Sequence, residues 1–178
     1  MTRLFVGFSV PSVVPLELQR KFNVYDLTLV KEFHLTLKFL GDVPEHTIPE
    51  IIQRLSSVHT PLPAFSFGSL GTFADSSWKP RVLWVSLRPE DPLLQLHDFI
   101  DTALHGLFPR DKQYTPHLTL GRFRSDKHIS VLPSALSMKL PSFTFLIKEF
   151  SLYKSEPTQH GPHQHLVLAR FSLHSYWW

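Results

Sequence analysis

The strongest constraint on the fold of this chain is the tetrapeptide His-Leu-Thr-Leu, which occurs twice, beginning at His34 and again at His117. Each copy lies in a run of residues that is typical of a β-strand. Side chains alternate between the two faces of a strand, so each copy presents its imidazole and hydroxyl on one face and its leucines on the other. The sequence therefore predicts two matched strands, each with one polar and one apolar face.

The same alternation places the residues that follow each copy. It puts Lys38 on the polar face of the first strand, where it could serve a phosphate or lie at the edge of a cleft, and Phe39 on the apolar face. In the second strand it directs Arg122 away from the histidine. A β-bulge at Gly121 would turn Arg122 back to the polar face.

The rest of the chain alternates strand and helix patterns in both halves. Helical periodicity predicts that Val13, Leu16 and Leu18 of the first helix, and Phe99 of the third, face the core. The segment 156–164 is expected to be a hairpin loop. We predict strands over 3–10, 34–41, 61–73, 81–87, 115–123, 141–155 and 165–178, and helices over 12–22, 43–58 and 89–108.

These elements indicate an α+β protein with two pseudo-symmetric lobes. Each lobe is expected to be an antiparallel β-sheet with helices on its outer face, and an active-site cleft is expected between the lobes. Residues 1–178 are expected to form a single domain of two interleaved lobes. The spacing of the two copies is too long for a short tandem repeat.

Composition narrows the class of protein. The 178 residues include no cysteine, which excludes disulfides and cysteine-based zinc sites. The formal net charge of +3 permits an anionic substrate without requiring one. No apolar stretch approaches the ~18 residues of a membrane helix. We expect a cytoplasmic protein that acts as a monomer, away from membranes.

Two histidines and two threonines on matched faces suit acid–base chemistry at phosphorus. One imidazole can accept a proton while the other donates one, because the ordinary pKa of histidine is ~6.5. The hydroxyls can hold the non-bridging oxygens as charge builds. A strained cyclic phosphodiester is a suitable target, and the scheme requires no metal. The alternative is two strand ends whose polar groups pair with nearby backbone. The pattern is symmetric and assigns neither histidine its role.

At these residues the chain resembles the two-histidine (2H) phosphoesterase superfamily. It is most similar to the RNA 2′,3′-cyclic phosphodiesterases of the LigT/ThpR type, also called 2′-5′ RNA ligases. RLFVGFSVP resembles the opening strand of that family, FHLTLKFLGDV its first motif, PRVLWVSL its middle strand and YTPHLTLGRF its second motif. The resemblance covers most of the chain.

The resemblance implies hydrolysis of RNA 2′,3′-cyclic phosphate ends to 2′-phosphomonoesters, without a cofactor or metal. It makes His34 the proton donor and His117 the proton acceptor. It assigns phosphate binding to Thr36, Thr119 and Arg122. RNA ends or small cyclic nucleotides would be the partners. Two alternatives stay open, namely 2′-5′ RNA ligation and an RNA-end or nucleotide-binding module with weak catalysis.

Two further features carry competing interpretations. His160, His163 and His165 lie close together in the sequence and could bind zinc or nickel, but a solvated hairpin loop is the simpler interpretation. Trp84 of the middle strand could stack on a base or pack in the core.

Overall fold

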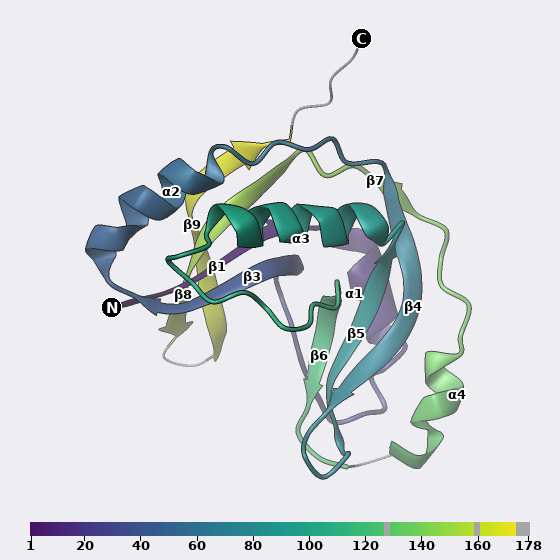
Figure 1. The fold of residues 1–178 in the computed structure, drawn as a ribbon. Coiled ribbons are helices and arrows are strands. Elements are labelled where there is room, and N and C mark those ends of the chain that lie inside the picture. The colour runs from purple at the N-terminus through teal and green to yellow at the C-terminus, as the bar shows by residue number, and fades with distance from the viewer. Residues whose placement is uncertain (127–128, 159–160, 174–178) are drawn as a thin grey trace.

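The computed structural model describes residues 1–126, 129–158 and 161–173, in which nine strands pair into one antiparallel sheet (Figure 1). The sheet order is β7-β4-β5-β6-β3-β1-β8-β9, and β2 pairs with β6 beside β3. The strands are β1 (Thr2–Ser9), β2 (Leu27–Leu29), β3 (His34–Val43), β4 (Phe65–Ala74), β5 (Pro80–Arg88), β6 (Leu118–Phe123), β7 (Thr144–Phe145), β8 (Glu149–Thr158) and β9 (Gly161–Ser172).

Short helices complete the described part of the chain; those before residue 109 lie within the three predicted helical segments, whereas the two over 129–136 lie outside them. Pro49 lies in the first turn of α2, where its missing N–H costs no hydrogen bond. The described helices are all too short or too polar to traverse a bilayer. They are α1 (Val13–Arg20), η1 (Glu45–Thr47), α2 (Ile48–Leu55), α3 (Asp91–Ala103), η2 (Ile129–Val131) and α4 (Leu132–Leu136).

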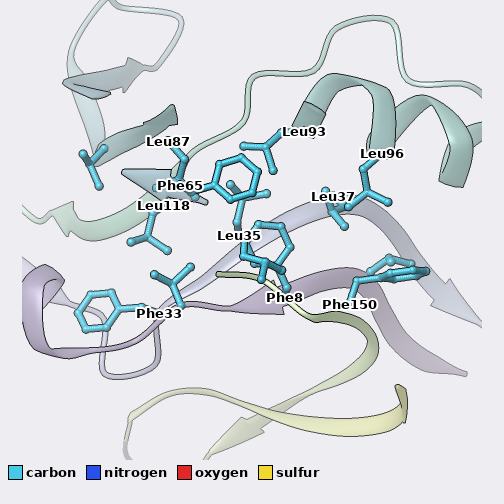
Figure 2. Close-up of a cluster of buried hydrophobic side chains, with 14 of the residues drawn as sticks. Phe8, Phe33, Leu35, Leu37, Phe65, Leu87, Leu93, Leu96, Leu118 and Phe150 are labelled. Atoms are coloured by element: carbon cyan, nitrogen blue, oxygen red, sulfur yellow. The ribbon is translucent and has the colours of Figure 1, made fainter. Parts of the chain in front are cut away.

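The sheet consists of two halves that meet at one pair of residues. One half contains β2, β4, β5, β6 and β7, and the other contains β1, β3, β8 and β9. Strands β3 and β6 join the halves through the single partnership of Leu35 with Leu118. Both leucines are fully buried, and in Figure 2 they lie in the same cluster as Leu93 of α3. We call this junction of β3 and β6 the seam.

The principal helices cross over between the halves. Helix α1 follows β1 in the sequence but packs against β6, and α3 follows β5 but packs against β3. Figure 1 shows α3 lying across the middle of the sheet, above β3 and β1. The apolar faces of both motif strands are therefore covered by helices that start from the opposite half.

Three side chains in helices do not face the core as predicted. Val13 and Leu16 of α1 are exposed at 66% and 41%, because Leu18, Gln19 and the following Phe22 form the buried contact instead. Phe99 of α3 is exposed at 47%. Helix α1 is only eight residues long, so few turns were available to define its inward face.

The predicted loop over 156–164 is also wrong for most of its length. Strand β8 runs to Thr158 and β9 begins at Gly161, so the hairpin is longer than expected. Pro157 is tolerated because it lies at a register shift, between the pairs of Glu156 and Thr158.

Candidate active site

The seam brings the two histidine motifs together. Leu35 and Leu118 are partners across antiparallel strands, so the residues one step away fall next to each other on the opposite face. This pairing places Thr36 beside His117, and it places His34 beside Thr119. Each imidazole is thus placed near the hydroxyl of the other motif. We call this side of the sheet the histidine face.

The second motif contains a β-bulge that turns Arg122 onto the histidine face. Along β5, Trp84 pairs with Thr119 and the next residue, Leu83, pairs with Gly121, so Leu120 is the extra residue. Leu83 belongs to the core, and Gly121 therefore points to the core side. Arg122 is exposed on the other side. The bulge predicted near Gly121 is present, one residue earlier.

A buried glutamine of helix α1 stabilises this bulge. Gln19, only 4% exposed, donates from Nε2 to the carbonyl of Leu120 at 2.7 Å and to that of Val30 at 2.8 Å. The Leu120 carbonyl also accepts a hydrogen bond from the backbone N–H of Val30 at 3.3 Å, so Gln19 adds a second and shorter one at the bulge. Sequence patterns do not indicate this role, because 101 residues separate Gln19 from Leu120.

The first motif contains a bulge at the equivalent leucine. Gly7 pairs with Thr36 and Val6 with Lys38, which leaves Leu37 as the extra residue. A Cβ on Gly7 would come within 2.5 Å of the carbonyl oxygen of Leu35, so the backbones approach too closely here for a larger residue.

This first bulge reverses the predicted directions of the next two side chains. Lys38 turns to the core side, where it is 2% exposed, so neither predicted position for it is correct. Phe39 turns to the histidine face, where it is 70% exposed and its ring lies 6.2 Å from that of Phe5. A lysine in a strand does not indicate a bulge. Strict alternation therefore predicted the wrong face for both Lys38 and Phe39.

His117 is held by a hydrogen bond that determines its tautomer. Its Nδ1 donates to the carbonyl of Thr115 at 2.8 Å, which leaves Nε2 to exchange protons. Phe73 contacts the imidazole edge-on at 4.7 Å between ring centroids, and Trp84 lies at 6.3 Å. Burial lowers the pKa of His117, the Thr115 hydrogen bond opposes this shift, and the charge of Arg122 adds to it.

His34 lies among aromatic rings from its own half of the sheet. Its ring centroid is 5.1 Å from that of Phe5 and 4.7 Å from that of His165. Burial, and then the charge of His165, lower the pKa of His34 to about 4, with smaller contributions from His117 and Arg122. These contributions indicate that the charges of both motifs and Arg122 act on one another.

His165 belongs to this site, which the sequence did not predict. It lies on β9, and its ring also contacts Phe5 edge-on at 5.0 Å. Its Nδ1 is buried without a hydrogen-bond partner. His163 instead bonds Ser155 at 3.0 Å, and His160 lies outside the described residues. The metal interpretation of these three histidines stays untested.

Trp84 also lies beside the histidine face. Its indole covers Gly71, where an added Cβ would come within 2.3 Å of the ring, and it contacts Phe73 at 5.3 Å. The indole is half-buried, and its Nε1 is buried without a partner. Trp84 therefore packs on the sheet next to His117, and base stacking by it stays a prediction.

One group of side chains in the described part of the chain has the spacing of a metal site. Ligand atoms of His97, Asp101 and Asp111 lie within 4.8 Å of one another. The Nζ of Lys38 lies 2.5 Å from Asp101 and 3.2 Å from Asp111. The ammonium of Lys38 thus already gives the two carboxylates the positive charge that a metal ion would supply. The group lies on the core side, away from the histidine face.

Comparisons with known proteins agree with this geometry. The sequence-family model of the 2′-5′ RNA ligase superfamily matches residues 17–159 of this chain. An RNA 2′,3′-cyclic phosphodiesterase of Methanocaldococcus jannaschii is 32% identical over 168 residues, covering 90% of this chain and 95% of its own. An RNA 2′,3′-cyclic phosphodiesterase of Archaeoglobus fulgidus is 34% identical over 134 residues, which cover 74% of this chain and 75% of the relative.

Solved structures share the fold over nearly the whole chain. The protein TT0787 of Thermus thermophilus has a TM-score of 0.71 and 26% identity, covering 96% of this chain and 97% of its own. E. coli LigT complexed with 3′-AMP has a TM-score of 0.73 and 22% identity, covering 98% and 99%. With both motifs on adjacent strands and the family model matched across them, the chain belongs to the 2′-5′ RNA ligase superfamily of 2H phosphoesterases.

Proposed function

We propose that this protein hydrolyses the 2′,3′-cyclic phosphate ends of RNA to 2′-phosphomonoesters. The observation that carries the proposal is the seam, which sets two imidazoles and two threonines side by side on one face of the sheet. Arg122 shares this face and supplies a positive charge for a phosphate. The curated relatives named for this activity support the same reaction.

The reaction divides between the two histidines. His117 accepts the proton of a water molecule as its oxygen bonds to phosphorus. The bond from phosphorus to the 3′-oxygen breaks, and His34 donates a proton to that leaving oxygen. Thr36, Thr119 and Arg122 hold the non-bridging oxygens while negative charge builds on them. The products are a 2′-phosphate and a free 3′-hydroxyl.

The donor role of His34 depends on the substrate. A pKa of about 4 leaves His34 neutral near pH 7 in the substrate-free protein. A phosphodiester anion bound next to the imidazole favours its charged form and so raises the pKa. Binding of the anion would thereby charge the residue that must donate the proton.

The proposed partners are RNA ends and small cyclic nucleotides. Ligation through a 2′-5′ bond runs related chemistry in reverse and is the second candidate activity, because the family model carries that name. A binding module with weak catalysis would not need two titrating groups beside each other. A cytoplasmic, monomeric protein stays a prediction.

The decisive experiment is an assay of a 2′,3′-cyclic-phosphate oligonucleotide in the presence of EDTA. We expect turnover, with a 2′-phosphate as the product identified by chromatography against 2′- and 3′-phosphate standards. A double variant, His34→Ala with His117→Ala, serves as the control preparation. Equal turnover by that control, or loss of activity on adding EDTA, would exclude the metal-free two-histidine mechanism.

A further inference from the structure

The buried ammonium of Lys38 connects the first motif to the segment that carries the second. Its side chain is 1% exposed, and Nζ has three oxygen partners: Asp101, Asp111 and the carbonyl of Pro109, at 2.5, 3.2 and 3.0 Å. The ammonium donates hydrogen bonds to Asp101 and to the Pro109 carbonyl, and it forms an ion pair with Asp111. Two of these partners, Pro109 and Asp111, lie in the stretch of chain that leads to His117.

The segment 109–117 is the second part of the connection from α3 to β6 and has no helix or strand of its own. Such a segment holds one conformation only where other groups fix it. Asp111 also contacts the Nε2 of His97 on α3 at 3.1 Å. Lys38 and His97 therefore tie Asp111, and with it the start of the segment, to strand β3 and helix α3.

Tyr114 provides a second attachment, nearer to His117. Its hydroxyl donates to the carbonyl of Thr36 at 3.0 Å, and its ring stacks on His97 at 4.0 Å. Burial raises the pKa of Tyr114, so the hydroxyl stays protonated and able to donate. The acceptor is the backbone of the first-motif threonine itself.

These contacts end at the residue that orients the second imidazole. The Nδ1 of His117 donates to the carbonyl of Thr115, one residue after Tyr114. A displacement of the segment would move that carbonyl and with it the Nε2 that exchanges protons. A misplacement of about 1 Å at a catalytic group can cost on the order of 10²-fold in rate.

We propose that Lys38 and Tyr114 are positioning residues, which hold segment 109–117 against β3 so that His117 faces the reacting phosphate. The coupling runs through the core side of the sheet and needs no substrate. This proposal rests on the proposed function only because that function names the reaction in which His117 takes part.

The first test compares Lys38→Met with wild type on adenosine 2′,3′-cyclic phosphate. We expect kcat to fall by about 10- to 100-fold with KM nearly unchanged, because the substrate contacts stay while the imidazole moves. Arg170→Met is the matched control, since Arg170 pairs with Glu149 at 3.2 Å on the exposed surface. An unchanged kcat in a folded Lys38→Met protein would overturn the proposal.

Tyr114→Phe covers the case in which Lys38→Met does not fold. It keeps the ring stack and the ion cluster and removes only the hydrogen bond to Thr36. We expect kcat to fall about fivefold, equivalent to one ordinary hydrogen bond. Both variants retaining wild-type kcat would show that segment 109–117 holds its position without these groups.

A spectroscopic measurement separates positioning from a general loss of stability. The imidazole Hε1 signals of His34 and His117 are followed by NMR, assigned with single histidine variants. In both test variants we expect the His117 signal to shift or broaden and the His34 signal to stay. Equal changes at both histidines, or at neither, would contradict the proposal. This result stands even if the wild type hydrolyses no cyclic phosphate, which would reject the proposed function alone.

Discussion

The two motifs share the same four residues and the same bulge, with His117 directly before β6, but strands β3 and β6 present different groups at the equivalent later positions. The residue after the bulged leucine is Lys38 in β3 and Gly121 in β6, and both turn to the core side. The next residue is Phe39 in one strand and Arg122 in the other, and both turn to the histidine face. A repeated backbone geometry thus gives an aromatic ring on one side of the seam and a cation on the other.

The comparison also shows that the two bulges are stabilised differently. The carbonyl of Leu120 in β6 accepts a hydrogen bond from a buried glutamine of α1. In β3 the neighbouring carbonyl, that of Thr36, accepts one from Tyr114. The first arrangement connects helix α1 to strand β6, whereas the second connects the first motif to the segment that leads to the second.

The largest expected effect tests whether the two strands are equal in catalysis. His34→Ala and His117→Ala should each lower kcat/KM by at least ~10²-fold, since each removes one partner of a concerted proton transfer. The double variant should lose little more than either single variant, because the two groups act as a unit. His46→Ala, on the exposed surface, is the control. Full activity in either single variant would show that one strand suffices.

The next effect tests the cation that only β6 presents. Arg122→Met should raise KM by about 10- to 100-fold, because a charge-assisted hydrogen bond to phosphate is lost. The same change should raise the pKa of His34 and of His117, since the charge of Arg122 lowers both. Steady-state kinetics across pH measure both results. An unchanged KM would mean that Arg122 does not reach the substrate.

A smaller effect tests the support of the bulge in β6. Gln19→Leu should lower the free energy of unfolding by about 1–3 kcal/mol, because buried carbonyls at Leu120 and Val30 lose a donor. Denaturant titration measures this change, with Gln53→Leu on the exposed side of α2 as the control. Equal stability of the two variants would mean that the bulge does not depend on Gln19.

The pH profile tests the different surroundings of the two imidazoles. Burial lowers the pKa of both histidines, so kcat/KM should be greatest on the acid side of pH 6.5, and one of the two limits of its bell-shaped profile should lie near pH 4, at the pKa of His34. His165→Gln removes a nearby positive charge, so it should raise the pKa of His34 and move that limit to higher pH. The limit stays below pH 6.5, because burial is the larger cause of the low pKa. A downward shift would contradict this assignment.

The smallest effect concerns the aromatic ring that β3 presents in place of a cation. Phe39→Ser should change the free energy of unfolding by no more than about 0.5 kcal/mol, because the ring is 70% exposed. Thermal unfolding measures this change. A loss of several kcal/mol would place the ring in the core, as strict alternation had predicted.

The sequence predicted most of the strands, the shared face of each histidine and threonine, and the buried leucines, but neither β2 nor the break between β7 and β8. It could not predict where Lys38 and Phe39 point, because the bulge leaves no mark in a lysine. The second copy contains a glycine at that place, and there a bulge was predicted. His165 was missed because its contact with His34 joins β9 to β3, two strands far apart in the sequence, and because the polar residues before it indicated a loop.

The crossing of helices between the halves has a consequence for how the molecule comes apart. A chain cut between Arg88 and Asp91 would leave α1 without β6, and α3 without β3. Neither fragment would then contain the partner that covers its apolar helix face. We expect the fragments to be unfolded alone and to regain structure and turnover together on mixing. Functional complementation between two inactive pieces would follow directly from this exchange of helices.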